Sequence, residues 1–149
     1  MRSNGGCKAT ASAGEIAAGY FDRDYNCAQS VLLAISEKRR IRLPMEMVDA
    51  CAALTGGLGK SGCTCGALVG ASLAIGLVEK ERRILYRKRR IVDATAGFHD
   101  LFQRRFRSTC CRVIRGGLDY DDPGLKDHCG RVTSSTAQML DDYLFGGQI

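Results

Sequence analysis

The chain has 149 residues, which is enough for one domain with its own hydrophobic core, so it does not need disulfides to fold as a small secreted scaffold does. Its formal net charge is +6. The longest apolar run, 67–78, is much shorter than the roughly 20 residues that cross a bilayer, and residues 1–13 lack the apolar stretch of a signal peptide. We therefore expect a cytoplasmic protein without membrane contact, with a disordered tail at 1–12 and a single domain at 13–149.

Apolar residues recur at helical spacing along nearly the whole chain, and no segment is convincing as a strand. The second helix has the clearest start, because Asn26 can cap it and Gln29 can complete a capping box. Pro44 suits the first turn of the third helix, and Ser108 or Thr109 suits the cap of the sixth. The predicted helices are 13–22, one that begins after Asn26 and ends within 37–42, 44–54, 64–78, 81–106, a short one before 116–117, and 126–145.

The helix predicted at 64–78 is apolar on all sides, which is typical of a helix in the middle of a bundle. Gly66, Gly70 and Ala74 recur every four residues and would let neighbouring backbones come close. The expected fold is all-α, a compact single-domain bundle around this small-residue helix. The loop before it matches G-x-G-x-x-G at 57–62, but it follows a helix, whereas a dinucleotide-binding loop must follow a strand.

Four of the 8 cysteines fall where helices are predicted to begin: Cys27, Cys65, Cys111 and Cys129. A helix N-terminus carries partial positive charge and unpaired N–H groups, so it favours a thiolate over a thiol. Thiolates attack disulfides and bind metals. If the four helix ends converge, they form a redox or metal site. The alternative is that each cysteine is a small buried packing residue.

Four segments resemble the signatures of the C-GCAxxG-C-C family of redox-active proteins, in order, over about residues 20–145: 25–32, 65–70, 108–112 and 128–129. The resemblance implies a helical protein with a redox role and fixes no reaction. A related cysteine pattern in split-Soret cytochromes is associated with an iron–sulfur centre. This chain lacks the Cys-x-x-Cys-His needed for covalent haem.

The resemblance selects Cys27, Cys65, Cys111 and Cys129 as the catalytic, cofactor-binding or metal-ligating set, with Cys63 and Cys110 as alternates. Cys51 is interpreted as core packing and Cys7 as a thiol of the tail. Two chemistries stay open. Four thiolates can hold an iron–sulfur cluster or a zinc ion, or two of them can cycle between thiols and a disulfide without any cofactor. His128, beside Cys129, is a further candidate to stabilise a thiolate or add a ligand.

Charge is uneven along the chain. Residues 80–115 carry 12 Lys and Arg against 3 acids, whereas residues 116–149 are acidic overall. The basic segment suits an acidic redox partner protein. Nucleic acid is less favoured, since few aromatic residues lie among the basic ones. A basic helical binding module with cysteines used only for packing is the competing function, and the pattern does not separate a monomer from a homo-oligomer.

Overall fold

The computed structural model describes residues 10–82 and 87–146, and this part of the chain is all-α, as predicted. Its one extended contact there is an isolated bridge between Thr64 and Cys110. The helices are α1 (Ala13–Asp22), α2 (Cys27–Arg39), α3 (Met45–Ala50), a 3-10 turn η1 (Cys51–Leu54), α4 (Gly66–Glu81), α5 (Arg87–Phe106), α6 (Cys111–Ile114), α7 (Leu125–Asp141) and a π-helical turn η2 (Asp142–Gly146).

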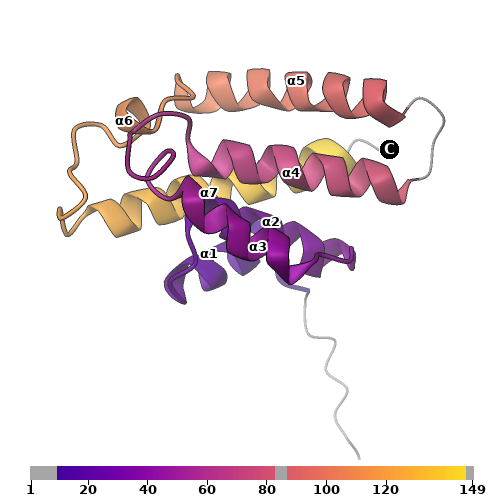
Figure 1. Cartoon of the computed structure of the whole chain (residues 1–149), viewed down its shortest axis with the longest axis horizontal. Coiled ribbons are helices and arrows are strands. Elements are labelled where there is room, and N and C mark those ends of the chain that lie inside the picture. The colour runs from indigo at the N-terminus through magenta and orange to yellow at the C-terminus, as the bar shows by residue number, and fades with distance from the viewer. Residues whose placement is uncertain (1–9, 83–86, 147–149) are drawn as a thin grey trace, which may run out of the picture.

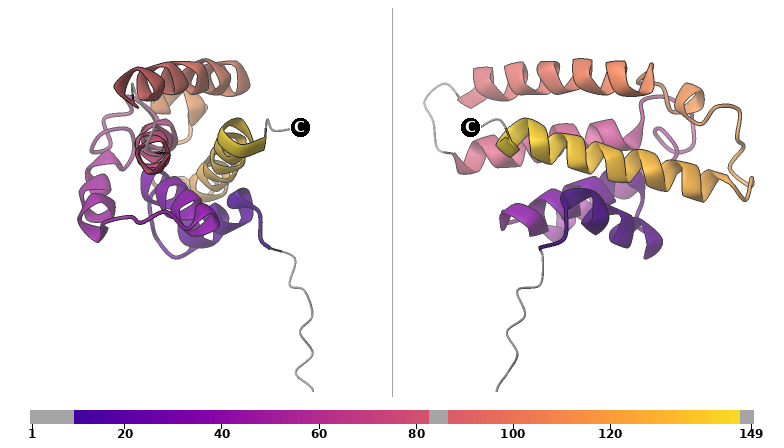
Figure 2. Two further views of the ribbon diagram at one scale, coloured as in Figure 1. Left: turned by 90° about the vertical axis from the view of Figure 1, so that its right-hand side faces the viewer. Right: turned by 180° about the vertical axis from the view of Figure 1, so that it is seen from behind.

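Helix α4 lies in the middle of the bundle, as its apolar sequence predicts. It packs against α5 on one side and against α2 and α7 on the other, while α1 packs against α2 and α7 (Figures 1 and 2). Many of the buried residues of α4 are glycine or alanine, and their small size lets the neighbouring helices pack closely against α4. The largest fully buried side chains come from α2, α3, α4, α5 and α7 and include Leu32, Ile35, Val48, Ile75, Phe98, Phe102 and Leu140.

The predicted close approach of backbones occurs between α4 and α2. A Cβ placed on Gly70 would lie only 2.5 Å from the carbonyl oxygen of Ala28 and 2.7 Å from its Cα. Any side chain at position 70 would therefore push the two helices apart. Glycine here sets the distance between α4 and α2.

Local capping explains the start of α2. The Asn26 side chain accepts the Gln29 N–H at 2.8 Å, and the Gln29 side chain accepts the Asn26 N–H at 3.0 Å. This is the reciprocal capping box that the sequence predicts. Helix α1 begins with the same arrangement between Ser12 and Glu15.

Three predicted boundaries are wrong. The helix predicted at 44–54 ends at Ala50 and continues as η1, and the one predicted at 126–145 ends at Asp141 and continues as η2. Helix α4 extends to Glu81, so the helix predicted from 81 begins at Arg87 instead, beyond residues 83–86, which lie outside the described residues.

The predicted cap of α6 is also wrong. The N-cap is Cys110 and makes no side-chain cap, whereas Ser108 accepts the Cys110 N–H at 3.0 Å. The disordered tail predicted at 1–12, with Cys7, lies mostly outside the described residues.

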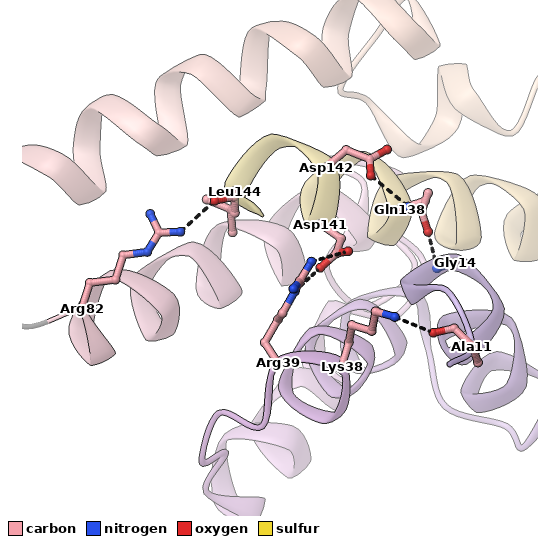
Figure 3. Close-up of polar contacts among 9 residues, drawn as sticks. All are labelled: Ala11, Gly14, Lys38, Arg39, Arg82, Gln138, Asp141, Asp142 and Leu144. Atoms are coloured by element: carbon pink, nitrogen blue, oxygen red, sulfur yellow. Dashed lines mark hydrogen bonds and ion pairs between the residues drawn. The ribbon is translucent and has the colours of Figure 1, made fainter. Parts of the chain in front are cut away.

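Ion pairs tie the helices together at the end of the bundle where α4 stops. Glu79 is only 3% exposed and is held by Arg82 at 2.9 Å and by Arg90 at 3.2 Å. Arg39 of α2 forms a bidentate pair with Asp141, at 2.7 and 2.8 Å (Figure 3). The Arg90–Glu79 contact shows that part of the basic segment at 80–115 stabilises the fold.

Within residues 10–82 and 87–146, no helix has the length and hydropathy that crossing a membrane requires.

The packing of α4 on α2 makes a direct prediction. Gly70→Ala should lower the free energy of unfolding by about 1–3 kcal/mol, because the new methyl group overlaps the Ala28 backbone. Gly76→Ala is the matched control, since nothing lies within 4 Å of a Cβ there. It should be neutral or stabilising by about 0.5–1 kcal/mol through helix propensity. Urea unfolding of both variants measures this, and equal effects would contradict the close approach.

Candidate redox site

The four predicted cysteines meet in one place. Cys27 is the first residue of α2, Cys65 is the N-cap of α4, and Cys111 is the first residue of α6. The prediction that Cys129 lies at a helix start is wrong, because α7 already begins at Leu125 and places Cys129 in its second turn. All four line a single cavity of about 700 Å³. It lies at the end of the bundle where α4, α6 and α7 begin, opposite the end where α4 and α7 stop (Figure 1). The exposed residues Thr55 and Tyr120 also line it, so the cavity reaches solvent.

The glycine loop (residues 56–62) and the residues just after it place Cys65 and Cys111. The Cys65 N–H donates to Thr109 O at 2.8 Å, and the Cys111 N–H donates to Cys63 O. Gly57 has a φ of +71°, and a Cβ on it would lie 2.6 Å from the Cβ of Cys111. A glycine is needed there both for the backbone conformation and for the space. The loop follows the helical turn η1 and not a strand, so its G-x-G-x-x-G pattern is not a dinucleotide-binding loop. Its glycines instead allow close packing against the start of α6.

Side-chain contacts tie the starts of α2 and α7 to the same end. The Asn26 amide donates to Cys51 O at 2.8 Å and to Thr55 Oγ1 at 3.0 Å. His128 Nε2 bonds to Ile114 O at 2.6 Å, which joins α7 to α6. The His128 ring is therefore used on the backbone of α6, and it does not line the cavity.

The four thiols have different environments. Cys65 is 5% exposed and Cys111 is 8% exposed, whereas Cys27 and Cys129 are half-buried. Burial, followed by the negative charge of a Cys27 thiolate, raises the pKa of Cys65 to about 12. Burial also raises the pKa of Cys111, and the Arg115 guanidinium opposes that rise in part. Both thiols stay protonated at neutral pH.

Cys27 is the exception, with a pKa lowered to about 7. The main cause is the neighbouring Cys129 thiol, and the nearby Thr133 hydroxyl and the Cys27 backbone N–H lower the pKa further against the cost of burial. The Thr133 hydroxyl is buried and makes no hydrogen bond to another described residue, so it is free to turn toward a Cys27 thiolate. The same interaction raises the pKa of Cys129, because its proton is the one shared with the Cys27 thiolate. Around neutral pH this pair therefore holds one negative charge and one proton.

A closed single-ion site is not formed. In residues 10–82 and 87–146, no group of three or more His, Cys, Asp or Glu side chains is placed to hold a metal ion. A tetrahedral zinc site needs four sulfurs about 2.3 Å from one point. The described cysteines are all free thiols: Cys27, Cys51, Cys63, Cys65, Cys110, Cys111 and Cys129.

The remaining described cysteines lie outside the cavity. Cys63 is exposed, and Cys110 points its thiol at Gly62 O at 3.2 Å. Neither lines the cavity, so their roles as alternates stay predictions. Cys51 is 3% exposed and belongs to the hydrophobic core, as its position on an apolar helix face predicts.

Two polar residues at the site were missed by sequence reasoning. Arg115 and Thr133 lie next to Cys111 and Cys27, and both act on the pKa of a cysteine. Each follows a site cysteine by four residues, Cys111 and Cys129 respectively. Residues four apart share a helix face, so this spacing was the available signal.

An all-α bundle in which three helix starts and the second turn of α7 bring four cysteines to one cavity defines a helical thiol protein. Residues 25–143 match the family model described as "Putative redox-active protein (C_GCAxxG_C_C)". Because the match covers most of the chain, the protein belongs to this redox-active family, as its four signature segments predict. No curated protein and no solved structure matched the chain.

The pKa of Cys27 makes a second prediction. Its rate of alkylation by iodoacetamide should rise with pH around a midpoint near 7, since only the thiolate reacts. Thr133→Val removes the hydroxyl that lowers the pKa of Cys27 and should raise the midpoint by about one pKa unit. Site-resolved mass spectrometry over a pH series measures the rates.

The matched control is Thr136→Val. Thr136 is another buried threonine of α7, but its hydroxyl donates to Val132 O at 2.7 Å. Its substitution should leave the Cys27 midpoint unchanged. An equal shift in both variants would show that a general loosening of α7, and not the Thr133 hydroxyl, changes the thiol.

Proposed function

We propose that this protein carries out thiol–disulfide exchange through Cys27 and Cys129, with a disulfide-containing molecule as the oxidant. The supporting observation is the unequal pair itself. A Cys27 thiolate with a pKa of about 7 lies beside the protonated thiol of Cys129, on the wall of a cavity that reaches solvent. A thiol with a pKa near ambient pH is the best attacking group in exchange.

The reaction balances within the pair and one substrate disulfide. The Cys27 thiolate attacks one substrate sulfur, the substrate S–S bond breaks, and the other sulfur leaves as a thiolate. Cys129 then attacks the Cys27 sulfur and forms the Cys27–Cys129 bridge, and its proton goes to a departing thiolate. One substrate disulfide is reduced to one thiol and one thiolate, which takes its proton from water, while the Cys27 thiolate and the Cys129 thiol become one disulfide.

Cys65 and Cys111 have a different role in this proposal. Their raised pKa values keep them protonated, so they do not compete with Cys27 as nucleophiles. They line the same cavity and, as neutral thiols, add no negative charge beside the reacting pair. Their burial also protects them from oxidants in solution.

An iron–sulfur cluster is the second candidate, and the observation that favours it is that all four cysteines line one cavity. Cys27, Cys65, Cys111 and Cys129 would then be the ligands, as four thiolates hold such clusters. A bound cluster would supply one-electron transfer. Helix N-termini and Arg115 would offset its negative charge. Zinc, the other candidate metal, would use the same thiols and supply no redox step.

An acidic protein is the partner that we propose for the reaction. Lys88, Arg104, Arg105 and Arg107 are exposed on and just after α5. Charge attraction would speed the encounter with an acidic protein and would weaken as salt is added. Reduction of an acidic protein disulfide should therefore slow with ionic strength, whereas reduction of an uncharged small disulfide should not.

The first experiment decides between the two chemistries. Protein purified without oxygen or added metal is assayed for iron, zinc and acid-labile sulfide, and its visible spectrum is recorded. We expect no stoichiometric metal, and a Cys27–Cys129 disulfide that forms with excess hydroxyethyl disulfide and is mapped by mass spectrometry. Iron with sulfide, lost in Cys27→Ser and Cys65→Ser, would replace the exchange proposal with electron transfer.

Variants assign the sulfurs. Cys129→Ser should stop the reaction at a mixed disulfide on Cys27, because the resolving sulfur is gone. Cys27→Ser should abolish reduction. Cys51→Ala is the control, since Cys51 packs in the core away from the cavity, and it should lower stability while leaving the exchange intact. Exchange that survives Cys27→Ser would refute the assignment.

A further inference from the structure

Arg115 is a buried cation in the wall of the cysteine cavity. It is 9% exposed and follows the last residue of α6. Its Nη1 donates to Leu118 O at 3.0 Å, and its guanidinium carbon lies 4.2 Å from the centre of the Tyr120 ring. The Nε–H is buried without any hydrogen-bond partner. A buried donor left unpaired in this way is costly and calls for an acceptor.

No carboxylate in the described part of the chain forms an ion pair with Arg115. Two aspartates line the same cavity, but both have other contacts. Asp24 lies 3.7 Å from Lys126, and Asp122 accepts the Gly124 N–H at 2.8 Å. The guanidinium charge is therefore offset only by a carbonyl, an aromatic ring and the polar Cys111 thiol. A buried charge in this state is stabilised by binding an anion.

We infer that Arg115 binds a carboxylate group of the molecule that enters the cavity. A guanidinium holds a carboxylate through the N–H groups of its planar fork, and the unpaired Nε–H is one such donor. The cavity volume of about 700 Å³ accommodates a small ligand beside Arg115 and Cys27 together. The inferred ligand class is a low-molecular-weight disulfide that carries a carboxylate. The disulfide part of this inference rests on the proposed exchange reaction, whereas the anion site does not.

Alkylation of Cys27 tests the anion site without any redox step. Iodoacetate and iodoacetamide have nearly the same size and differ by one negative charge. The ratio of their rate constants at Cys27, measured by mass spectrometry, cancels any change in the Cys27 pKa or exposure. Arg115→Met should lower the ratio of iodoacetate to iodoacetamide rates by about tenfold. Arg115→Lys should restore part of it, because the charge returns without the fork.

Lys126→Met is the control, because it removes the other cation of the cavity, which is exposed and close to Asp24. It should change the ratio less than about twofold, since exposed charges are screened by water and salt. A ratio that Arg115→Met leaves unchanged, or that Lys126→Met lowers as much, would overturn the assignment of Arg115.

Wild-type protein provides a test that does not depend on a variant that folds. Thiodipropionate is a dicarboxylate with no disulfide, and thiodiglycol is its uncharged counterpart. Thiodipropionate should protect Cys27 from iodoacetamide in a saturable way, and thiodiglycol at the same concentration should not. Equal protection, or none by either compound, would overturn the anion site.

Disulfide substrates separate this inference from the proposed function. Dithiodipropionate should be reduced faster than hydroxyethyl disulfide by the wild-type protein, and Arg115→Met should remove most of the difference. Equal rates for both disulfides would refute the carboxylate preference and leave the exchange reaction standing. Reduction of neither, with the iodoacetate preference intact, would refute the exchange reaction and leave Arg115 as an anion site.

Discussion

The backbone hydrogen bonds between residues 62–65, at the end of the glycine loop, and residues 109–112, at the start of α6, are the constraint on which the site depends. Cys65 bonds to Thr109 O, Cys111 bonds to Cys63 O, and the Arg112 N–H bonds to Gly62 O at 3.1 Å. These segments are separated along the chain by the α4–α5 pair, so the bonds close a long loop and bring two helix starts together. The entropic cost of that closure is met by the packing of α4 against α5, which returns the chain to the same end.

Chemically identical side chains become unequal because their surroundings differ. The pKa of Cys27 is lowered by the Cys129 thiol, the Thr133 hydroxyl and its own backbone N–H, whereas the pKa of Cys65 is raised by burial and by a nearby negative charge. The fold thus separates one nucleophile from three protonated thiols without using a lysine or histidine beside it. That separation depends on α2 and α7 lying next to each other, because Cys129 and Thr133 both belong to α7.

Local signals were sufficient for part of this structure. The Asn26–Gln29 capping box involves residues three apart, and the apolar stripe of α2 is a short-range pattern, so the sequence predicts both correctly. The positions of Cys27, Cys65 and Cys111 at helix starts were also predicted correctly, whereas Cys129 lies one turn inside α7. Buried Glu79 was not predictable in this way, because its partner Arg90 comes from α5 and acids are normally exposed. The cap of α6 failed for a similar reason, since bonds to the segment after the glycine loop replace a side-chain cap.

The contact between Gly70 and Ala28 has a consequence beyond packing. Ala28 adjoins Cys27, and Gly70 lies little more than one helical turn after Cys65. A change in the Gly70–Ala28 distance would therefore move Cys27 relative to α4. The tendency of two thiols to join depends on their effective concentration, which changes steeply with small displacements of the helices that carry them. In the proposed exchange reaction, the size of residue 70 would tune the reduction potential of the Cys27–Cys129 pair, because Gly70 sets the position of the helix that carries Cys27.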